Sequence, residues 1–418
     1  MTDTLLHRGP DDRGLWVGDG ASLGVRRLSI IDVTGGHQPI PNEDGSVLVV
    51  LNGEIYNYRA VRDRLEGQGH SFRTRSDTEV VVHLYEEYGD AFLHLVQGMF
   101  GVALWDAGRR RLLLARDRLG IKPLYYAETP DGVAFASEAK ALFEHPAIKP
   151  EINSDALDRY LSLRYVPGED TLFRGVKKLP PGHLLVHENG RTEVRCYWHL
   201  VLGDFQTAVN LDEAVEEFAT LLRETVRAHL VSDVPIGVLL SGGLDSSAVT
   251  AMMTRTSDRP VTSFTVGFDL PGTHNELAEA RRVARYLGTD HHELVVKPAA
   301  VELLPKLAWH MDEPVADPAA LPTYLICKFA RESVPVVLTG EGGDELLAGY
   351  PPLCLVPAVA GAQPDRAPGG AGKAASPVGP AGSAERPLSA SPRQRPGRAR
   401  RRHAAAQLGP GPRAGTQG

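Results

Sequence analysis

Short hydrophobic runs, separated by Gly, Asp and Asn, fill the first 200 residues of the chain. Five of them have the composition and turn-bounded spacing of β-strands: SVLVVLNGEIYN, FGVALWD, RLLLARD, PLYYAE and GVAFASE. Two other stretches have apolar residues at helical spacing. These are NYRAVRDRLEGQG and SDTEVVVHLYEEYGDAFLHLV, where Ser76 or Asp77 can cap the helix and Glu79 lies in its first turn. The first half of the chain therefore predicts an α+β domain.

The hydrophobic pattern changes at about residue 211. One helical stripe comes first, formed by Val215, Phe218, Leu222, Val226 and Leu230. Strand-like runs then alternate with helical ones, in the order VPIGVLL, AVTAMMT, VTSFTVGF, ELAEARRVARYLG, HHELVV, TYLICKFARES and VPVVLTG. Strands that alternate with helices predict a doubly wound, mostly parallel α/β sheet.

Residues 351–418 have a different composition from both halves. They contain ten basic residues but only Asp365 and Glu385 as acidic ones, together with 12 of the 31 prolines and no aromatic residue. Such a segment cannot bury enough apolar surface to offset its ordering entropy, so we expect a disordered tail. A basic RNA-binding tail is the alternative. Because RPGRARRRH has no interleaved aromatic residues for base stacking, we expect no nucleic-acid partner.

The overall composition excludes several classes of protein. The 418 residues allow two or three domains, and 42% hydrophobic with 23% charged residues is typical of globular proteins. The chain has no apolar run near the roughly 18–20 residues that span a bilayer, and no secretion signal at its start. Its three cysteines, Cys196, Cys327 and Cys354, have neither metal-ligand nor disulfide spacing. We therefore expect a cytoplasmic protein with no membrane partner.

The strongest motif is SGGLDSS, residues 241–247, between an apolar strand and a helix. Its glycines allow backbone to approach a ligand closely, and the free N–H groups at a helix N-terminus attract phosphate. It lacks the lysine of a Walker A loop, so binding a γ-phosphate is not its evident task. A plain strand–turn–helix junction is the simpler alternative. The string resembles the pyrophosphate loop of ATP pyrophosphatases, which release pyrophosphate and transfer AMP to a substrate.

A second polar motif, LTGEGGDELLAGY, follows the strand VPVVL. It places Glu341, Asp344 and Glu345 at the carboxyl end of a strand, where α/β sheets bind ligands. With Asp245 across the crevice, these carboxylates could hold the Mg²⁺ that accompanies ATP. An ordinary acidic, solvated loop is the alternative.

Polar clusters beside tight turns recur in the first half of the chain: HRGPDDRG, RLSIID, GHQPI, NGEIYN and SDTE. Arg27, Asn52, Glu54 and Asp77 could together hold a zwitterionic amino acid, with the guanidinium toward its carboxylate and the carboxylates toward its ammonium group. Taken singly, each string also fits a plain hairpin turn or helix cap.

Taken together and in this order, these strings and the motifs SGGLDSS and GEGGDE resemble the glutamine-hydrolysing asparagine synthetases over about residues 1–350. The resemblance implies a class II glutamine amidotransferase domain over residues 1–195, an Ntn-hydrolase-like α+β sandwich whose first strand is missing here. It implies an ATP-pyrophosphatase-type α/β domain over residues 211–350, joined to the first by an ammonia tunnel, with the tail over 351–418. The family converts aspartate, glutamine or ammonia, and ATP into asparagine, AMP and pyrophosphate through β-aspartyl-AMP, with Mg²⁺. A homodimer is also compatible with the resemblance.

The resemblance assigns site residues position by position. The glutamine site comprises Arg27, Ser29, Ile30, Ile31, Asn52, Gly53, Glu54 and Asp77. The ATP site comprises Leu240, Ser241, Gly242, Gly243, Asp245, Ser246, Val266, Thr339 and Gly340. Asp245 and Asp344 correspond to magnesium ligands, and Glu341 to the carboxylate important for forming and amidating the intermediate.

The chain departs from the family pattern at both ends. The family begins with Met and then a cysteine whose α-amino group is the general base for its own thiol. Here residue 2 is Thr2, and neither Thr2 nor Cys196 lies in a matching context, so we expect no glutaminase activity from this chain. Beyond residue 350 the family continues with helices. The tail found here is rich in Ala, Gly, Pro and Arg, as expected if a GC-rich gene is read out of frame.

Two alternative functions stay open. One is a non-catalytic remnant that still binds nucleotide. The other is a related amidotransferase or a β-lactam synthetase-like enzyme, which shares the pyrophosphate loop. Release of AMP separates an active synthetase from the remnant, and asparagine as the product separates it from the related enzymes.

Overall fold

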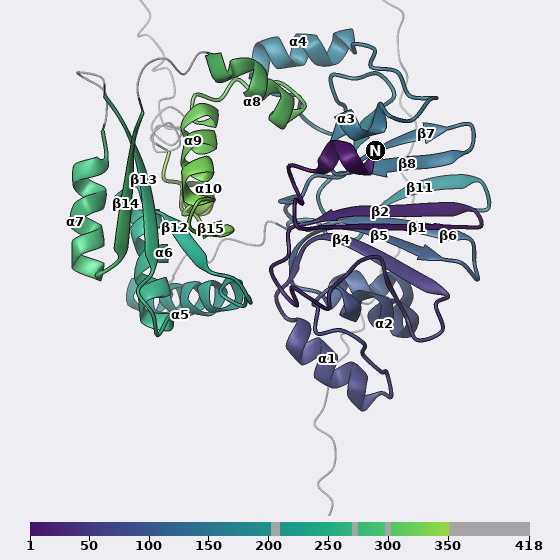
Figure 1. Ribbon diagram of the computed structural model, residues 1–418, viewed down its shortest axis with the longest axis horizontal. Helices are drawn as coiled ribbons and strands as arrows, with labels where there is room; N and C mark the ends of the chain where they lie inside the picture. The colour runs from purple at the N-terminus through teal and green to yellow at the C-terminus, as the bar shows by residue number, and fades with distance from the viewer. Residues whose placement is uncertain (202–209, 270–274, 297–301, 351–418) are drawn as a thin grey trace, which may run out of the picture. The chain divides into compact units, whose positions relative to one another are not determined.

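A six-stranded antiparallel sheet forms the centre of the N-terminal domain in the computed structural model (Figure 1). Its strand order is β11-β10-β6-β5-β4-β3. The strands are β3 (Ile40–Pro41), β4 (Val47–Ile55), β5 (Gly98–Asp106), β6 (Arg111–Arg116), β10 (His183–Glu188) and β11 (Arg191–Cys196). The structure describes residues 1–201, 210–269, 275–296 and 302–350. Cys354 and the tail predicted to be disordered lie outside the described residues.

Both faces of this sheet are covered, which explains the unbroken hydrophobic run of β4. Because successive side chains of a strand point to opposite faces, Val47, Val49 and Leu51 pack with the helices while Leu48 and Val50 pack with other strands. The helices on the first face are α1 (Tyr58–Gly67), α2 (Glu79–Tyr88) and the 3₁₀ helix η2 (Gly89–His94). The strands on the second face are β1 (Asp12–Gly18), β2 (Ala21–Arg27), β7 (Tyr125–Thr129), β8 (Gly132–Ala136) and β9 (Lys177–Lys178).

A fourth layer completes the N-terminal domain. The short helix α3 (Ala139–Leu142) buries Ala139 and Leu142 against β7 and β8, and Leu5 of the 3₁₀ helix η1 (Thr2–Leu5) joins the same cluster. Helix α4 (Ser154–Leu163) follows. The order helix, sheet, sheet, helix confirms the predicted α+β sandwich.

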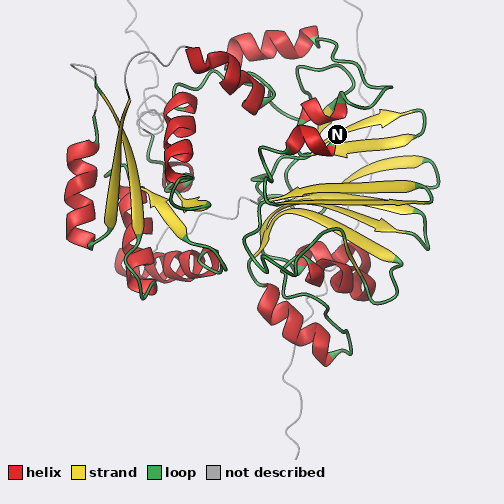
Figure 2. Ribbon diagram, in the orientation of Figure 1, coloured by secondary structure: helices red, strands yellow, loops and turns green. Residues whose placement is uncertain are grey.

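The second domain is built on a four-stranded parallel sheet with the order β14-β13-β12-β15. Its strands are β12 (Ile236–Leu239), β13 (Thr262–Phe268), β14 (Asp290–Val296) and β15 (Val336–Leu338). The helices are α5 (Leu211–His229), α6 (Leu244–Thr256), α7 (Leu277–Leu287), α8 (Leu304–Met311), α9 (Ala320–Ala330) and α10 (Gly343–Leu347). Figure 2 shows the sheet of this domain with helices around it.

Separate hydrophobic clusters hold the helices to this parallel sheet. Val226 of α5 and Met253 of α6 pack with Val238 of β12, whereas Ile326 of α9 packs with Phe264 of β13. The domain thus has the predicted doubly wound α/β architecture.

Three details differ from the expectations. The second helix begins at Glu79 with Thr78 as its N-cap, because the Ser76 hydroxyl accepts from the Thr78 N–H in a turn before the helix. Glu79 does lie in the first turn. In α5 only the C-terminal part of the predicted stripe packs, since Val215 and Phe218 are exposed. Helices α4 and α8 and the hairpins β1–β2 and β10–β11 were not among the predicted elements. No helix among the described residues combines the length and apolarity needed to cross a membrane.

Candidate functional site

The residues predicted to bind glutamine gather at one cavity of about 1250 Å³ that is lined mostly by residues of the N-terminal domain. Seven of the eight predicted residues line it: Arg27, Ile30, Ile31, Asn52, Gly53, Glu54 and Asp77. Ser29 lines a neighbouring cavity of about 590 Å³ instead, where its N–H donates to the Asp11 carboxylate at 2.9 Å. Residues from three separate segments of the sequence therefore meet at one concave site.

The NGE string occupies the end of strand β4 opposite β5. Gly53 pairs with Phe100 and has a φ of 147°, and a Cβ there would lie 1.9 Å from the carbonyl oxygen of Met99. Only glycine fits this backbone without displacing β5. The neighbouring Asn52 amide donates to the Ser137 hydroxyl at 3.2 Å. The close strand packing thus fixes the directions of Asn52 and Glu54 at the cavity wall.

Hydrogen bonds hold the SDTE string beside β4. The N–H of Ile55 donates to the Asp77 carboxylate at 2.8 Å. Gln38, from the GHQPI string, bridges the same two segments: it accepts from the Leu51 N–H at 2.8 Å and donates to the Thr78 hydroxyl at 3.2 Å. The structure therefore gives the GHQPI string a positioning role.

Glu54 and Asp77 form an electrostatically unfavourable pair when no cation is between them. Glu54 is only 8% exposed, and burial, followed by the nearby Asp77 charge, raises its pKa to about 7. Burial also raises the pKa of Asp77. A ligand ammonium group would stabilise the ionised form of both carboxyls, which is the chemistry expected of an amino-acid site.

Lys122 is a cavity residue that the sequence analysis did not find. Burial lowers the pKa of its ammonium group, as does the charge of Arg8, while the carboxylates of Glu54 and Asp117 act in the opposite direction. Glu138 also lines the cavity and accepts from Arg8 at 3.1 Å. Neither residue lies in a motif with a recognisable ligand pattern, so only the fold shows that they belong to this site.

The Arg27 guanidinium has a structural role. It is buried, and its Nη2 donates to the carbonyl oxygens of Ile31 and Asp32 at 2.6 and 3.0 Å. Burial lowers the pKa of Arg27, while nearby aspartates, including Asp12 and Asp77, oppose that shift. Because a guanidinium has five N–H donors, some stay available for a ligand carboxylate while others shape the turn at residues 31–33.

The two glycine-rich motifs of the second domain meet where the strand order of the sheet reverses. Strand β13 lies on one side of β12 and β15 on the other, so the loops after β12 and β15 lie next to each other at the same edge of the sheet. A Cβ on Gly340 would lie 2.6 Å from the Ser246 nitrogen, and one on Gly343 would lie 2.5 Å from the Asp245 carboxyl carbon. The two loops therefore pack backbone to backbone.

The SGGLDSS loop is braced by its own serines. The Ser246 hydroxyl accepts from the Ser241 N–H at 3.2 Å and lies 2.9 Å from the Ser241 hydroxyl, which accepts from the Gly243 N–H at 3.2 Å. Gly242 has a φ of 86°, a conformation that favours glycine. Helix α6 begins at Leu244, and its first N–H groups have no intrahelical acceptors. The serines thus hold the loop in place, and the first turn of α6 presents the backbone donors.

The other residues predicted to bind ATP and magnesium are not packed together as the two glycine-rich loops are. Leu240 is buried, and its carbonyl oxygen accepts from the Thr265 hydroxyl of β13, while Val266 packs with the sheet core. The Thr339 hydroxyl accepts from the N–H of Glu341, whose side chain is exposed. Among the described residues, Asp245 and Asp344 do not join a third ligand in a compact metal-binding group.

Family models match both domains. A glutamine amidotransferase domain matches residues 1–198, and an asparagine synthase domain matches residues 217–414. The fold, the two sites and these matches define a class of protein: an amidotransferase domain followed by an asparagine synthase-type α/β domain.

Curated relatives identify the family. The chain is 39% identical to asparagine synthetase [glutamine-hydrolyzing] 1 of Bacillus subtilis, and 40% identical to a putative asparagine synthetase of Mycobacterium tuberculosis, over 85% and 84% of its length. It spans 57% of the length of each of these relatives. It is 34% identical to putative asparagine synthetase [glutamine-hydrolyzing] 2 of Methanocaldococcus jannaschii, over 84% of this chain and 72% of that protein. The chain belongs to the family of glutamine-hydrolysing asparagine synthetases.

Proposed function

We propose that this chain carries the glutamine-binding and ATP-using parts of an asparagine synthetase. The reaction is the amidation of aspartate to asparagine, with ATP cleaved to AMP and pyrophosphate. The family takes the ammonia from glutamine, whereas the expectation that this chain does not itself hydrolyse glutamine stays a prediction. The observation that carries the ATP-dependent step is the packing of Gly340 and Gly343 on the SGGLDSS loop at the reversal of strand order. A cytoplasmic location and a homodimer stay predictions.

The N-terminal cavity supports the proposed glutamine site by its charge. Glu54 and Asp77 supply two carboxylates for the α-ammonium group, and the remaining N–H groups of Arg27 can meet the α-carboxylate. Because both carboxyls are buried, their attraction for a bound ammonium group is stronger than it would be in water. The Asn52 amide, held by Ser137, offers a polar group to the ligand.

The two glycine-rich loops support the proposed nucleotide site by their packing and by their backbone hydrogen-bond donors. Backbone N–H groups of the SGGLDSS loop and the first turn of α6 can bind phosphate oxygens. Residues Asp245 and Asp344 would hold Mg²⁺, and the ion would neutralise phosphate charge when bound. The packing of Gly343 on the Asp245 carboxyl group restricts where that side chain can point.

An ammonium-driven assay tests the synthetase part by itself. The purified chain is incubated with aspartate, ATP, Mg²⁺ and ammonium chloride, and AMP, pyrophosphate and asparagine are measured. We expect all three products from the parent and a loss of them in Asp245→Asn. The matched control is Asp258→Asn, an exposed aspartate just after α6 in the same domain. Products at parental levels in Asp245→Asn would contradict the assigned role, and AMP without asparagine would indicate a different acceptor.

Calorimetric titration with glutamine tests the N-terminal site. We expect Asp77→Asn to weaken binding at least tenfold, because the variant removes one of two carboxylates facing the ammonium group. Asp63→Asn, at an exposed position of α1, is the matched control and should bind as the parent does. Equal affinity in all three proteins would contradict the glutamine site.

A further inference from the structure

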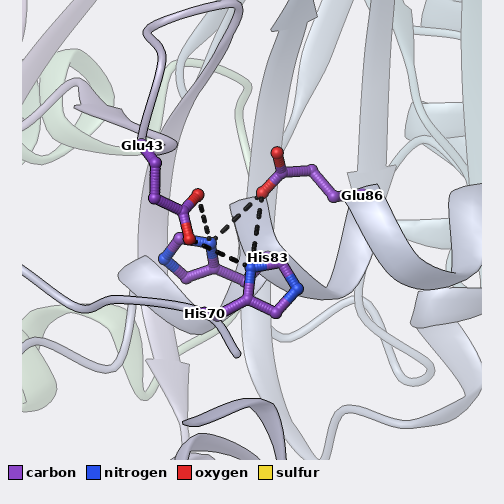
Figure 3. A group of neighbouring side chains, drawn as sticks. All are labelled: Glu43, His70, His83 and Glu86. Atoms are coloured by element: carbon purple, nitrogen blue, oxygen red, sulfur yellow. Dashed lines mark hydrogen bonds and ion pairs between the residues drawn. The ribbon is translucent and has the colours of Figure 1, made fainter. Parts of the chain in front are cut away.

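Two histidines and two glutamates meet outside both proposed sites. Glu43 comes from the turn between β3 and β4, His70 from the segment after α1, and His83 and Glu86 from one face of α2. Each residue offers one ligand atom, and these atoms all lie within 4.8 Å of one another. Figure 3 shows the four polar ends directed toward one another. None of the four lines the glutamine cavity.

Three of the four nitrogen–oxygen distances in this group are close to those of a tetrahedral metal centre. Ligands about 2.0–2.1 Å from a zinc ion are separated by roughly 3.3 Å from one another. Nδ1 of His83 lies 3.2 Å from a carboxylate oxygen of Glu43 and 3.2 Å from one of Glu86. Nδ1 of His70 lies 3.1 Å from the other carboxylate oxygen of Glu43 and 3.9 Å from the same oxygen of Glu86. A rotation that brings one Glu43 oxygen close to both histidines would complete the tetrahedron.

Hydrogen bonding alone accounts poorly for this arrangement. A single Nδ1–H of His83 faces two carboxylates at the long end of the N–H···O range, so it cannot serve both well. The His83 ring is fully buried. The Glu43 and Glu86 carboxylates also accept from the Ser71 N–H at 3.1 Å and the Asn42 amide at 2.7 Å, but they lie close to each other with like charges. A divalent cation between the four groups would pair both carboxylates at once.

The outer nitrogens of the two rings provide an independent observation. Nε2 of His70 lies 3.1 Å from the Glu87 carboxylate. Nε2 of His83 is buried without a hydrogen-bond partner among the described residues, and its nearest recorded carboxylate is Glu79 at 3.9 Å. Histidine ligands of metals commonly direct their second ring nitrogen at a carboxylate, which orients the ring and raises its basicity.

We propose that Glu43, His70, His83 and Glu86 form a binding site for a divalent transition metal, best matched by Zn²⁺. Two imidazole nitrogens and two carboxylate oxygens suit zinc, whereas Mg²⁺ and Ca²⁺ prefer oxygen ligands alone. The site has a structural role because it joins three segments of the chain.

One of these segments leads directly to the glutamine cavity. Glu79 accepts from the N–H groups of Arg73 and Thr74 at 2.7 Å each, and so ties the segment after His70 to helix α2. Asp77 follows within this segment. A metal that binds His70 and His83 therefore stabilises the loop that carries Asp77.

Zinc retention tests this proposal directly. The full chain, without a polyhistidine tag, is stripped with a chelator, equilibrated with micromolar Zn²⁺, freed of unbound metal and analysed by atomic emission. We expect the parent to retain about one zinc ion per chain more than Glu43→Gln or Glu86→Gln. The zinc affinity of these two variants should be lower than that of the parent by roughly tenfold or more. The matched control, Glu66→Gln at an exposed position of α1, should retain zinc as the parent does. These variants keep the buried His83 intact, and circular dichroism checks that they fold.

Cobalt(II) gives a second measurement on the same proteins. A tetrahedral site produces a visible absorption band, which we expect in the parent and in Glu66→Gln but not in Glu43→Gln. Zinc should also raise the melting temperature of the parent and of the control only. No zinc retained by the parent at micromolar concentration, or equal zinc in the parent and in both cluster variants, would overturn the proposal.

Discussion

The substitution Glu54→Gln tests the electrostatics of the glutamine cavity. Glu54 is 8% exposed, and its pKa is raised from an ordinary value of 4.5 to about 7, first by burial and then by the charge of Asp77. An acid with a raised folded-state pKa binds its proton more tightly in the folded than in the unfolded chain. Its protonated form therefore contributes stability that is fully present below pH 4.5 and is lost as the pH rises through about 7.

The size of this effect follows from the difference between the two pKa values. At roughly 1.4 kcal/mol per unit, a rise from 4.5 to about 7 corresponds to about 3 kcal/mol. Glutamine has the shape of a neutral glutamate and does not titrate. As the pH rises from acidic values to roughly pH 8, the unfolding free energy of the parent should therefore fall by about 3 kcal/mol relative to that of Glu54→Gln.

Hydrogen–deuterium exchange of peptides covering β4 measures this difference locally. Parent and variant are compared at the same pH, so the intrinsic chemical rate of exchange cancels. At each pH, the exchange rate of the β4 amides in the parent is divided by the rate in Glu54→Gln. We expect this ratio to be roughly 100-fold larger near pH 8 than near pH 5. Glu66→Gln is the control, because its side chain is exposed and should give no pH-dependent difference. A ratio between parent and Glu54→Gln that stays constant across this pH range would refute the reasoning.

Three further predictions concern packing. Gly53→Ala should lower the melting temperature and abolish glutamine binding, because its Cβ would lie 1.9 Å from the Met99 oxygen, whereas Gly67→Ala, with open space around it, should be nearly neutral by the same measurements. Gly340→Ala should weaken ATP binding in calorimetry while circular dichroism stays unchanged, because its Cβ would press 2.6 Å from the backbone of the SGGLDSS loop; parental affinity would contradict the packing described. Leu104→Ala removes a fully buried side chain and should cost about 2–5 kcal/mol in denaturant unfolding; a cost well below this range would mean that the site collapses around the cavity.

Much of the secondary structure could be predicted from local patterns. The strand β4 and the helices α1, α6 and α7 lie where hydrophobic spacing places them, because that spacing records which face each segment buries. Helix α4 and the β10–β11 hairpin were missed. Strand β11 illustrates the reason: five of its six residues are exposed, so its sequence shows little alternation of hydrophobic and polar positions.

The candidate sites were predicted unequally well. Asn52, Gly53, Glu54 and Asp77 were found because each lies in a motif, and the structure brings them to one cavity. Ser29 lines a different cavity, and Lys122 was missed because nothing in its local sequence marks a buried cation. The magnesium and catalytic roles of Asp344 and Glu341 stay predictions.

The sequence by itself determined the fold class, the two glycine-rich motifs and seven residues that line the N-terminal cavity, because these depend on residue type and on neighbours within a few positions. Only the tertiary structure decided that β15 pairs with β12, which brings Gly340 onto the SGGLDSS loop from about 95 residues away. It alone assembled Glu43, His70, His83 and Glu86 from three segments. Contacts of this kind arise from the packing of whole elements, and no local pattern of hydrophobic and polar positions records them.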